Sequence, residues 1–451
     1  MDSELWSKIL DFPLDEETGE YTFSIRLANE NQWTLWFTRN AILEYKKFMY
    51  LAACAEAMVS PSEIVDKVWH QHLIYTESYS AFCVVLGKEI KHVPSSHDPQ
   101  KATKFAEAMV LTQQLYKKHF GELPVQFWKQ KSMLDSIGDS QRKKSALSVV
   151  LFYFFLLCVC CVPAFFLFRP IFSILPSPQF QFGILGIALV VLVGLEFKNR
   201  TEIGRWFSNL DADSFLFHLH PFELIYLKSR NVKHLVHAGV NELIKDGTLE
   251  VVDGKSLRAK KEQTPQELIA KQIVFEVNEF EEPNYSGLFP RIRRKPLFQN
   301  IAISMDLVKK NLDESAKMRR LLRLNCLFMI LVLVPAISRI TTGISRDKPV
   351  GFMVLLTLVL MVIFAWYLYH VMELPLASLL PKSYKKDEMR RSESGYWDYF
   401  LIGSLALMPE FKPLMEQVKR DSGSTTWTDT ASCGTGSGCG GACGGCGGCG
   451  S

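Results

Sequence analysis

The sequence of 451 residues predicts a mainly α-helical membrane protein, with four transmembrane helices as two hairpins and cytosolic domains around them. Three observations predict this fold class: four long apolar runs, polar segments that carry most of the 51 Lys and Arg and 47 Asp and Glu residues, and basic clusters on one side of each run. The mean hydropathy of only +0.07 averages over these two kinds of segment. The net charge of +4 is too small to indicate a nucleic-acid partner.

Residues 1–140 are expected to form a mainly helical cytosolic domain. The acidic start of this segment lacks the basic-then-apolar order of a signal peptide, so we place it in the cytosol. Residues 21–27 alternate as a short strand does, and residues 41–59 have helical apolar spacing. A capping box then predicts the start of another helix, with Ser60 as N-cap, Pro61 in the first turn and Glu63 reaching back to the cap amide.

The lengths of the four apolar runs are close to the roughly 20 residues that a helix needs to cross a bilayer. They cover residues 146–168, 180–197, 324–344 and 350–372. The second run is the shortest, and a buried core helix is the alternative interpretation for it.

Basic clusters at the ends of the runs predict the orientation, because Lys and Arg near helix ends are retained in the cytosol. The clusters are Arg142 to Lys144 before the first run, Lys198 to Arg205 after the second, Lys317 to Arg323 before the third, and Lys382 to Arg391 after the fourth. The loops within each pair of runs carry fewer basic residues. Two hairpins with both termini in the cytoplasm therefore satisfy all four clusters.

The polar segment between the hairpins, residues 198–320, is expected to form a second cytosolic domain. Helical patterns cover residues 214–228 and 232–245, and Asp253-Gly254 then supplies a tight turn between two short strands. This order of two helices and a hairpin predicts a winged-helix-like unit. Its second helix is not strongly basic, so a protein-contact module is favoured over DNA binding.

The chain ends in a cytosolic segment, residues 373–430, and a Cys/Gly-rich tail, residues 431–451. Residues 433–451 contain ten glycines and five cysteines, a composition that predicts disorder. The spacing of Cys439, Cys443, Cys446 and Cys449 allows several thiolates to reach one thiophilic metal ion such as zinc. Two alternatives stay open: enzymatic modification of Cys and Ser that follow Gly, and a tail without a ligand.

A second candidate metal site involves Asp66, His70 and His92 in the first domain. Asp66 and His70 are four residues apart on the predicted helix and share a face, and His92 or His97 from the next loop can join them. Such a group can hold zinc or orient a proton-transferring imidazole. A structural Asp–His hydrogen bond is the alternative. His72 falls on the apolar stripe and is interpreted as a core histidine.

Other polar residues are explained by structure. Helix capping and packing account for His218, His220, His234 and His237 in the middle segment. Arg339 lies near the outer end of the third run, where its side chain can snorkel to the interface, so an ion pathway is not favoured.

Two resemblances extend over most of the chain. FSIRLANENQW, EYKKFMYLA, SPSEIVDKVWHQHLIYTESYSAFC and LYKKHFGELPVQFW, within residues 22–128, resemble the glycine-rich domain-containing protein family. HPFELIYLKSRNVKHLVHAGVNELIKDGTLEV, ISRDKPVGFMVLLTLVL and the tail, within residues 200–451, are similar to an uncharacterised family of bacterial membrane proteins with a Cys- and Gly-rich C-terminal tail. That family has a Gly-Gly pair where this chain has Lys228-Ser229-Arg230. The resemblance implies a bacterial inner membrane and no particular chemistry.

These observations favour a membrane-anchored interaction or carrier protein whose tail binds metal or is modified, with the lipid bilayer and other proteins as partners. No nucleophile elbow, Walker loop, dinucleotide fingerprint or metalloprotease motif is present, so an enzyme is not favoured. The alternative function is a metal-dependent hydrolase with its site near Asp66, His70 and His92.

Overall fold

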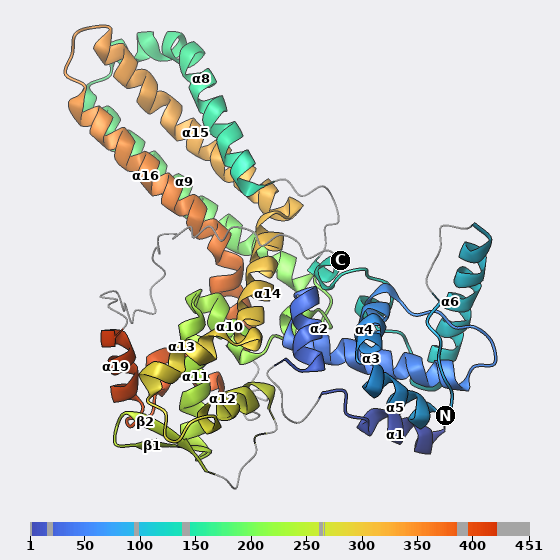
Figure 1. Cartoon of the computed structure of the whole chain (residues 1–451). Coiled ribbons are helices and arrows are strands. Elements are labelled where there is room, and N and C mark those ends of the chain that lie inside the picture. The colour runs from blue at the N-terminus through green and yellow to red at the C-terminus, as the bar shows by residue number, and fades with distance from the viewer. Residues whose placement is uncertain are drawn as a thin grey trace, which may run out of the picture.

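The computed structural model describes residues 2–15, 21–93, 99–137, 145–260, 265, 267–385 and 396–421. It is mainly helical, as predicted, and its described strands form one short hairpin. A bundle of four long helices stands on a helical body with two parts, an N-terminal part and a middle part (Figure 1).

The N-terminal part is built around one long central helix, α3, with shorter helices packed around it. Its elements are α1 (Ser3–Asp11), α2 (Phe23–Asn31), α3 (Leu35–Cys54), α4 (Glu63–Ile74), α5 (Thr76–Leu86), α6 (Pro99–Phe120), α7 (Val125–Trp128) and the 3₁₀-helix η1 (Met133–Ile137).

The strand predicted at residues 21–27 is wrong, because this segment begins α2. Phe23, Ile25 and Leu27 are all buried, which gives the sequence its alternation. They are buried because α2 is covered on more than one side, by α3 and α4 within the N-terminal part and by α14 of the middle part. A short helix enclosed in this way loses the one-sided pattern of a surface helix.

The predicted N-cap at Ser60 is also wrong, because α4 begins two residues later and Ser62 is its cap. The Ser62 hydroxyl accepts from the amide of Val65 at 3.2 Å and donates to the carbonyl of Phe127 at 2.6 Å. The amide of Ser60 instead donates to Thr112 Oγ1 at 2.9 Å. Both serines flank Pro61, and only tertiary contacts decide between them.

The middle part contains the predicted pair of helices and the hairpin. Its elements are the 3₁₀-helix η2 (Phe215–Phe217), α10 (Pro221–Ser229), α11 (Val232–Lys245), β1 (Leu249–Val252), β2 (Ser256–Ala259), α12 (Leu268–Asn278), α13 (Tyr285–Arg294) and α14 (Pro296–Asp313). The strands pair antiparallel, with Leu249 opposite Ala259. Asp253 and Gly254 both have positive φ, 50° and 64°, as the predicted tight turn requires.

The helix predicted over residues 214–228 is interrupted, whereas the one predicted over 232–245 is confirmed. The interruption lies between η2 and α10, where Pro221 starts the new helix and His220 caps it. The Nδ1 atom of His220 accepts from the Phe222 amide at 3.4 Å, and Glu223 accepts from the His220 amide at 2.8 Å. This confirms the capping role predicted for His220.

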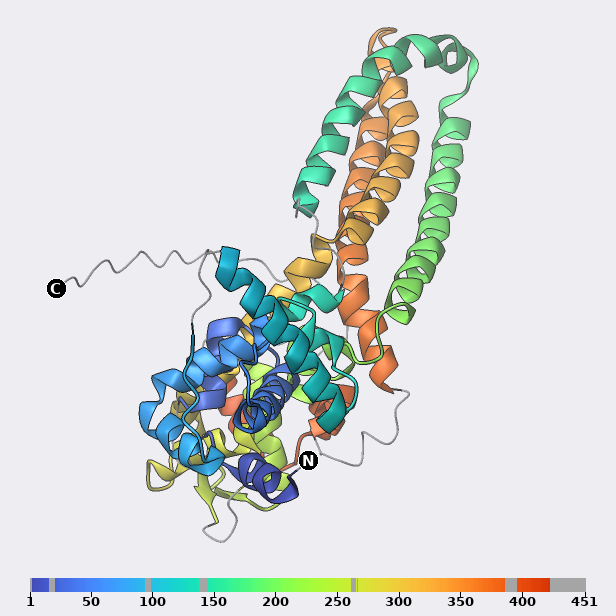
Figure 2. The same cartoon turned by 90° about the vertical axis from the view of Figure 1, so that its right-hand side faces the viewer.

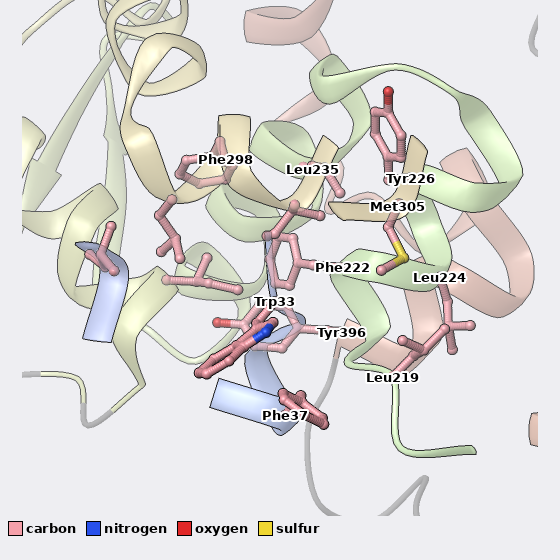
Figure 3. Packing of buried hydrophobic residues seen from close by; sticks show 14 of the residues in the cluster. Trp33, Phe37, Leu219, Phe222, Leu224, Tyr226, Leu235, Phe298, Met305 and Tyr396 are labelled. Atoms are coloured by element: carbon pink, nitrogen blue, oxygen red, sulfur yellow. The ribbon is translucent and has the colours of Figure 1, made fainter. Parts of the chain in front are cut away.

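The segment after the bundle returns to the middle part. It forms α18 (Tyr396–Ile402), the 3₁₀-helix η5 (Gly403–Ala406) and α19 (Lys412–Asp421), and these pack against α10, α11 and α13. Tyr396 lies beside Phe222 in the core, with ring centroids 4.7 Å apart (Figure 3).

The N-terminal and middle parts share one continuous hydrophobic core. Trp33 and Phe37 reach the side chains of the middle part in Figure 3. The buried carboxylate of Glu223 accepts from the first amide of α3, that of Leu35, at 2.9 Å, while it also caps α10. Desolvation raises the pKa of Glu223, and the hydrogen bonds from the Leu35 and His220 amides partly oppose this rise. One carboxylate therefore joins two helices across the interface.

The four apolar runs are all helical, and their helices are long and apolar enough to cross a membrane. They are α8 (Ala146–Ile174), α9 (Ser177–Ser208), α15 (Ala316–Ile344) and α16 (Gly351–Leu374), the last followed by a π-helical turn, η3 (Pro375–Leu379), and α17 (Leu380–Lys385). The α8–α9 and α15–α16 turns lie together at the end of the bundle far from the body (Figure 1). Figure 2 shows α8 and α9 on opposite sides of the α15–α16 pair, where α8 packs along α15.

Arg339 connects the two turns of the bundle. Its guanidinium donates to the carbonyls of Phe172 and Leu175 at the end of α8, and to Ser177 Oγ at 3.0 Å. The helical partner of the Phe172 carbonyl would be the nitrogen of Pro176, which carries no proton. Arg339 therefore satisfies carbonyls that the helix end leaves without a donor, and its charge has a structural explanation.

Candidate metal centre

Two residues of the candidate metal centre lie on helix α4, which places Asp66 and His70 one turn apart on the same face. The Nδ1 atom of His70 lies 3.2 Å from Asp66 Oδ2 and 2.9 Å from the Asp66 carbonyl oxygen. Asp66 is in the first turn of α4, where the positive end of the helix dipole favours a carboxylate. This local geometry follows directly from the spacing in the sequence.

His92 reaches the same face from the segment that follows α5. Gly87, with φ of 68°, ends α5 in the left-handed conformation and lets the chain turn back. The Tyr79 hydroxyl donates to the carbonyl of Ile90 and accepts from the indole of Trp69 at 3.1 Å, which fixes the segment against α4. The imidazole of His92 packs edge-on against Trp69, with ring centroids 4.6 Å apart.

Asp66, His70 and His92 thus offer one ligand atom each, and these atoms lie within 4.8 Å of one another. His92 Nε2 lies 3.1 Å from Asp66 Oδ1, and the two imidazole centroids are 4.4 Å apart. Zinc bonds to nitrogen and oxygen of about 2.0–2.1 Å imply ligand–ligand distances of about 3.3 Å in a tetrahedron. The two contacts to Asp66 are close to this value, but they use different carboxylate oxygens and also fit the Asp–His hydrogen bond that is the alternative interpretation.

The centre is open to solvent on one side. The side chain of His92 is 16% exposed, that of Asp66 34% and that of His70 55%. Two imidazoles and a carboxylate suit zinc and other divalent transition metals, and three protein ligands leave a position for water or a further ligand. The structure therefore brings together the three residues that the sequence singled out. His97 lies outside the described residues.

His72 lies on the opposite, buried face of α4 and takes no part in the centre. Its Nδ1 atom is 2.8 Å from the Tyr45 hydroxyl and its Nε2 atom 3.1 Å from Ser78 Oγ. Burial lowers the pKa of His72 to about 4, so the ring is neutral at physiological pH. The predicted role as a core histidine with satisfied hydrogen bonds is confirmed.

The histidines of α11 are structural in the same way. His237 is buried, with Nδ1 2.8 Å from the Tyr285 hydroxyl and its ring stacked on Phe289 at 5.1 Å. Burial lowers the pKa of His237 to about 3. His234 contacts Tyr399 of α18 at 3.0 Å.

A polar cluster between the four long apolar helices was not predicted from the sequence. Asn199 of α9 and Asn325 of α15 exchange two hydrogen bonds of 2.9 and 3.0 Å, and Asn199 also donates to the hydroxyl of Tyr367 in α16. Glu196 and His370 extend the cluster at 3.4 Å. Each of these residues lies near the end of its run, where polar residues are ordinary, so only the three-dimensional structure reveals that they meet. Such bonds fix the register of membrane helices.

The cysteines of the second candidate site, Cys439, Cys443, Cys446 and Cys449, lie outside the described residues, as does the predicted disorder of the tail. Comparisons with protein-family models, with curated proteins and with solved structures give no match for this chain, so its function has to be argued from its own residues.

Proposed function

We propose that this chain is a membrane-anchored metal-binding protein, an interaction or carrier protein whose helical domains lie at the cytosolic face of a bacterial inner membrane. The observation that supports the metal-binding role is the convergence of Asp66, His70 and His92 within 4.8 Å. Two helical hairpins anchor the protein in the bilayer. The middle part, with its winged-helix-like order of helices and hairpin, serves as a protein-contact module rather than a nucleic-acid reader.

The Cys/Gly tail is the second ligand set in this proposal. Cys439, Cys443, Cys446 and Cys449 bind a thiophilic metal such as zinc in a reducing cytosol, where thiols stay free. A carrier needs a site that captures an ion and a site that passes it on. The N/O ligands of the N-terminal part and the thiolates of the tail differ in softness, which suits such a transfer.

Metal binding is tested on the full chain, purified in mild detergent and equilibrated with zinc. We expect His70→Ala/His92→Ala to lose one ion per chain relative to the unaltered chain, and removal of residues 433–451 to lose the tail-bound metal separately. His119→Ala removes an imidazole of the N-terminal part outside the centre and serves as the matched control. Metal content is measured by elemental mass spectrometry, and circular dichroism checks the fold.

Equal metal content in the double histidine variant and the unaltered chain would exclude the N-terminal centre. The intact mass of the tail answers the modification alternative, because cyclisation to an azoline removes one water from each modified residue and oxidation to the azole removes two further hydrogens. A tail of unmodified mass that binds no metal would exclude both of its proposed roles.

The proposed topology has a test of its own. Reporter fusions at Ser177 and Asp347 are expected to behave as external, and fusions at Asp246 and Ser424 as internal. The reason is that Lys and Arg clusters at helix ends stay on the cytosolic side of the membrane. A cytosolic signal at Ser177 would mean that the first two helices do not form a crossing hairpin. An external signal at Ser424 would place the cysteines in an oxidising compartment and contradict the thiolate tail as well.

A metal-dependent hydrolase is the second candidate, supported by the exposure of His70, which would leave room for water on an ion held by the three residues. A zinc-bound water would be the nucleophile. Activated ester and phosphate substrates distinguish the two functions. Turnover that disappears in His92→Ala would favour the hydrolase, whereas bound metal without turnover favours the carrier.

A further inference from the structure

The inference concerns a line of exposed cations at the body end of α15, formed by Lys317, Arg320 and Arg323. Their spacing of three residues places them on one face of the helix. Leu327 and Leu331 continue the same face toward the far end of the bundle and are exposed as well. The face therefore changes from cationic to apolar along its length, as lipid does from headgroup to hydrocarbon.

The change from cationic to apolar residues along α15 falls where the boundary between headgroups and hydrocarbon is expected. Residues 324–344 of α15 rise about 30 Å at 1.5 Å per residue, which equals the thickness of a typical hydrocarbon core. With this segment inside the core, Arg323 lies at the boundary, and Arg320 and Lys317 lie among the headgroups. The bundle continues there into the helical body, through α14 (Figure 1).

The three cations have no carboxylate partner among the described residues. On α9, which packs against α15, Arg200 pairs with Glu196 and Arg205 with Glu202. The ammonium of Lys317 lies 5.3 Å from the ring centroid of the buried Trp206, which is a cation–π contact and not an ion pair. These exposed cations lack a negative partner within the described part of the chain, and an apolar face lies beside them. A ligand with an anionic head and apolar tails would match both features.

We propose that Lys317, Arg320 and Arg323 bind the phosphate headgroup of an anionic phospholipid. The guanidinium groups of Arg320 and Arg323 can each bind phosphate oxygens with two donors, and Lys317 adds a point charge. The acyl chains then run along Leu327 and Leu331. This site is independent of the proposed metal centre and fixes the depth of α15 in one leaflet.

The test uses the full chain in vesicles of equal phosphatidylglycerol and phosphatidylcholine, extracted with mild detergent. Co-purified lipids are counted by native mass spectrometry. The unaltered chain is expected to retain phosphatidylglycerol over phosphatidylcholine, and added salt lowers this preference. Each cation near anionic lipid contributes about fivefold, so Lys317→Gln/Arg320→Gln is expected to lower the preference about 25-fold.

The matched control is Arg346→Gln/Lys348→Gln, which removes the same charge from the exposed turn at the opposite end of the bundle. It is expected to lower the preference much less, because Asp347 between the two cations offsets part of their charge. An unchanged preference in the first variant, or an equal loss in the control, would overturn the proposal. Displacement of the lipid by millimolar inorganic phosphate would also overturn it, because the site would then recognise free phosphate.

Discussion

Replacing Glu44 by Ala is expected to destabilise the N-terminal part by about 3–5 kcal/mol, the usual cost of breaking a buried charged network. The Glu44 carboxylate accepts from the Tyr116 hydroxyl at 2.8 Å, from the Trp128 indole at 2.7 Å and from the ammonium of Lys47 at 2.8 Å. Only 4% of its side chain is exposed, so water cannot replace it. Truncation would leave the Tyr116 hydroxyl and the Trp128 indole without their acceptor between α3, α6 and α7, and Lys47 without its charge partner.

The measurement is hydrogen exchange of the full chain in detergent, followed by mass spectrometry of peptides from α3 and α6. Peptides from the middle part report whether the effect is local. Glu122→Ala is the matched control, because it breaks an ion pair of 2.6 Å with Lys117 whose partners are 80% and 68% exposed. The control is expected to change nothing measurable. Similar exchange in both variants would show that burial of Glu44 adds no stability.

Acidification from pH 7 to pH 5 is expected to destabilise the helical body through His72 and His237. Burial lowers their pKa values to about 4 and about 3, whereas an unfolded histidine titrates near 6.5. The folded state binds fewer protons, so their contribution is complete above pH 6.5 and is lost as the pH falls toward the folded pKa values. At pH 5 the contribution of each histidine to the free energy of unfolding is about 2 kcal/mol lower than above pH 6.5. At still lower pH the loss reaches about 3 kcal/mol for His72 and about 5 kcal/mol for His237.

Asp313 in α14 acts in the opposite direction. Burial raises its pKa to about 6 from about 3.8, so its ionisation opposes folding and acidification relieves this cost. Local hydrogen exchange separates the effects, since His72 lies in the N-terminal part. His72→Gln and His237→Gln, measured at pH 7 and pH 5, should each reduce the acid sensitivity of their own part. An acid sensitivity equal to that of the unaltered chain in both variants would contradict the prediction.

Local patterns were enough to predict much of this structure. The apolar runs predicted four long helices, because a bilayer crossing requires a continuous apolar segment whatever the rest of the chain does. Helix 232–245 was predicted with both ends correct from its helical pattern, and the structure shows Asn231 and Asp246 as its caps. Asp66 and His70 were placed on one face by helix geometry alone.

Features that depend on distant contacts were missed. Contacts with Thr112 and Phe127 decide that Ser62, and not Ser60, caps α4. Burial against α14 favours the helical state of residues 23–27. The Glu223–Leu35 bond joins residues 188 positions apart, and no local pattern signals it. His92 was predicted correctly to join Asp66 and His70, with His97 as the alternative, although no local pattern signals the Tyr79–Ile90 bond that directs it.

The contacts of Arg339 also bear on the order in which the chain is built. Phe172, Leu175 and Ser177, which supply its acceptors, leave the ribosome long before Arg339 does. A lone arginine at the centre of a membrane-spanning helix costs roughly 2.5–3.5 kcal/mol on the insertion scale, and Arg339 lies nearer the end of α15, where this cost is smaller. In the folded structure, α8 and the start of α9 thus supply the acceptors for Arg339, and these acceptors precede it in the order of synthesis.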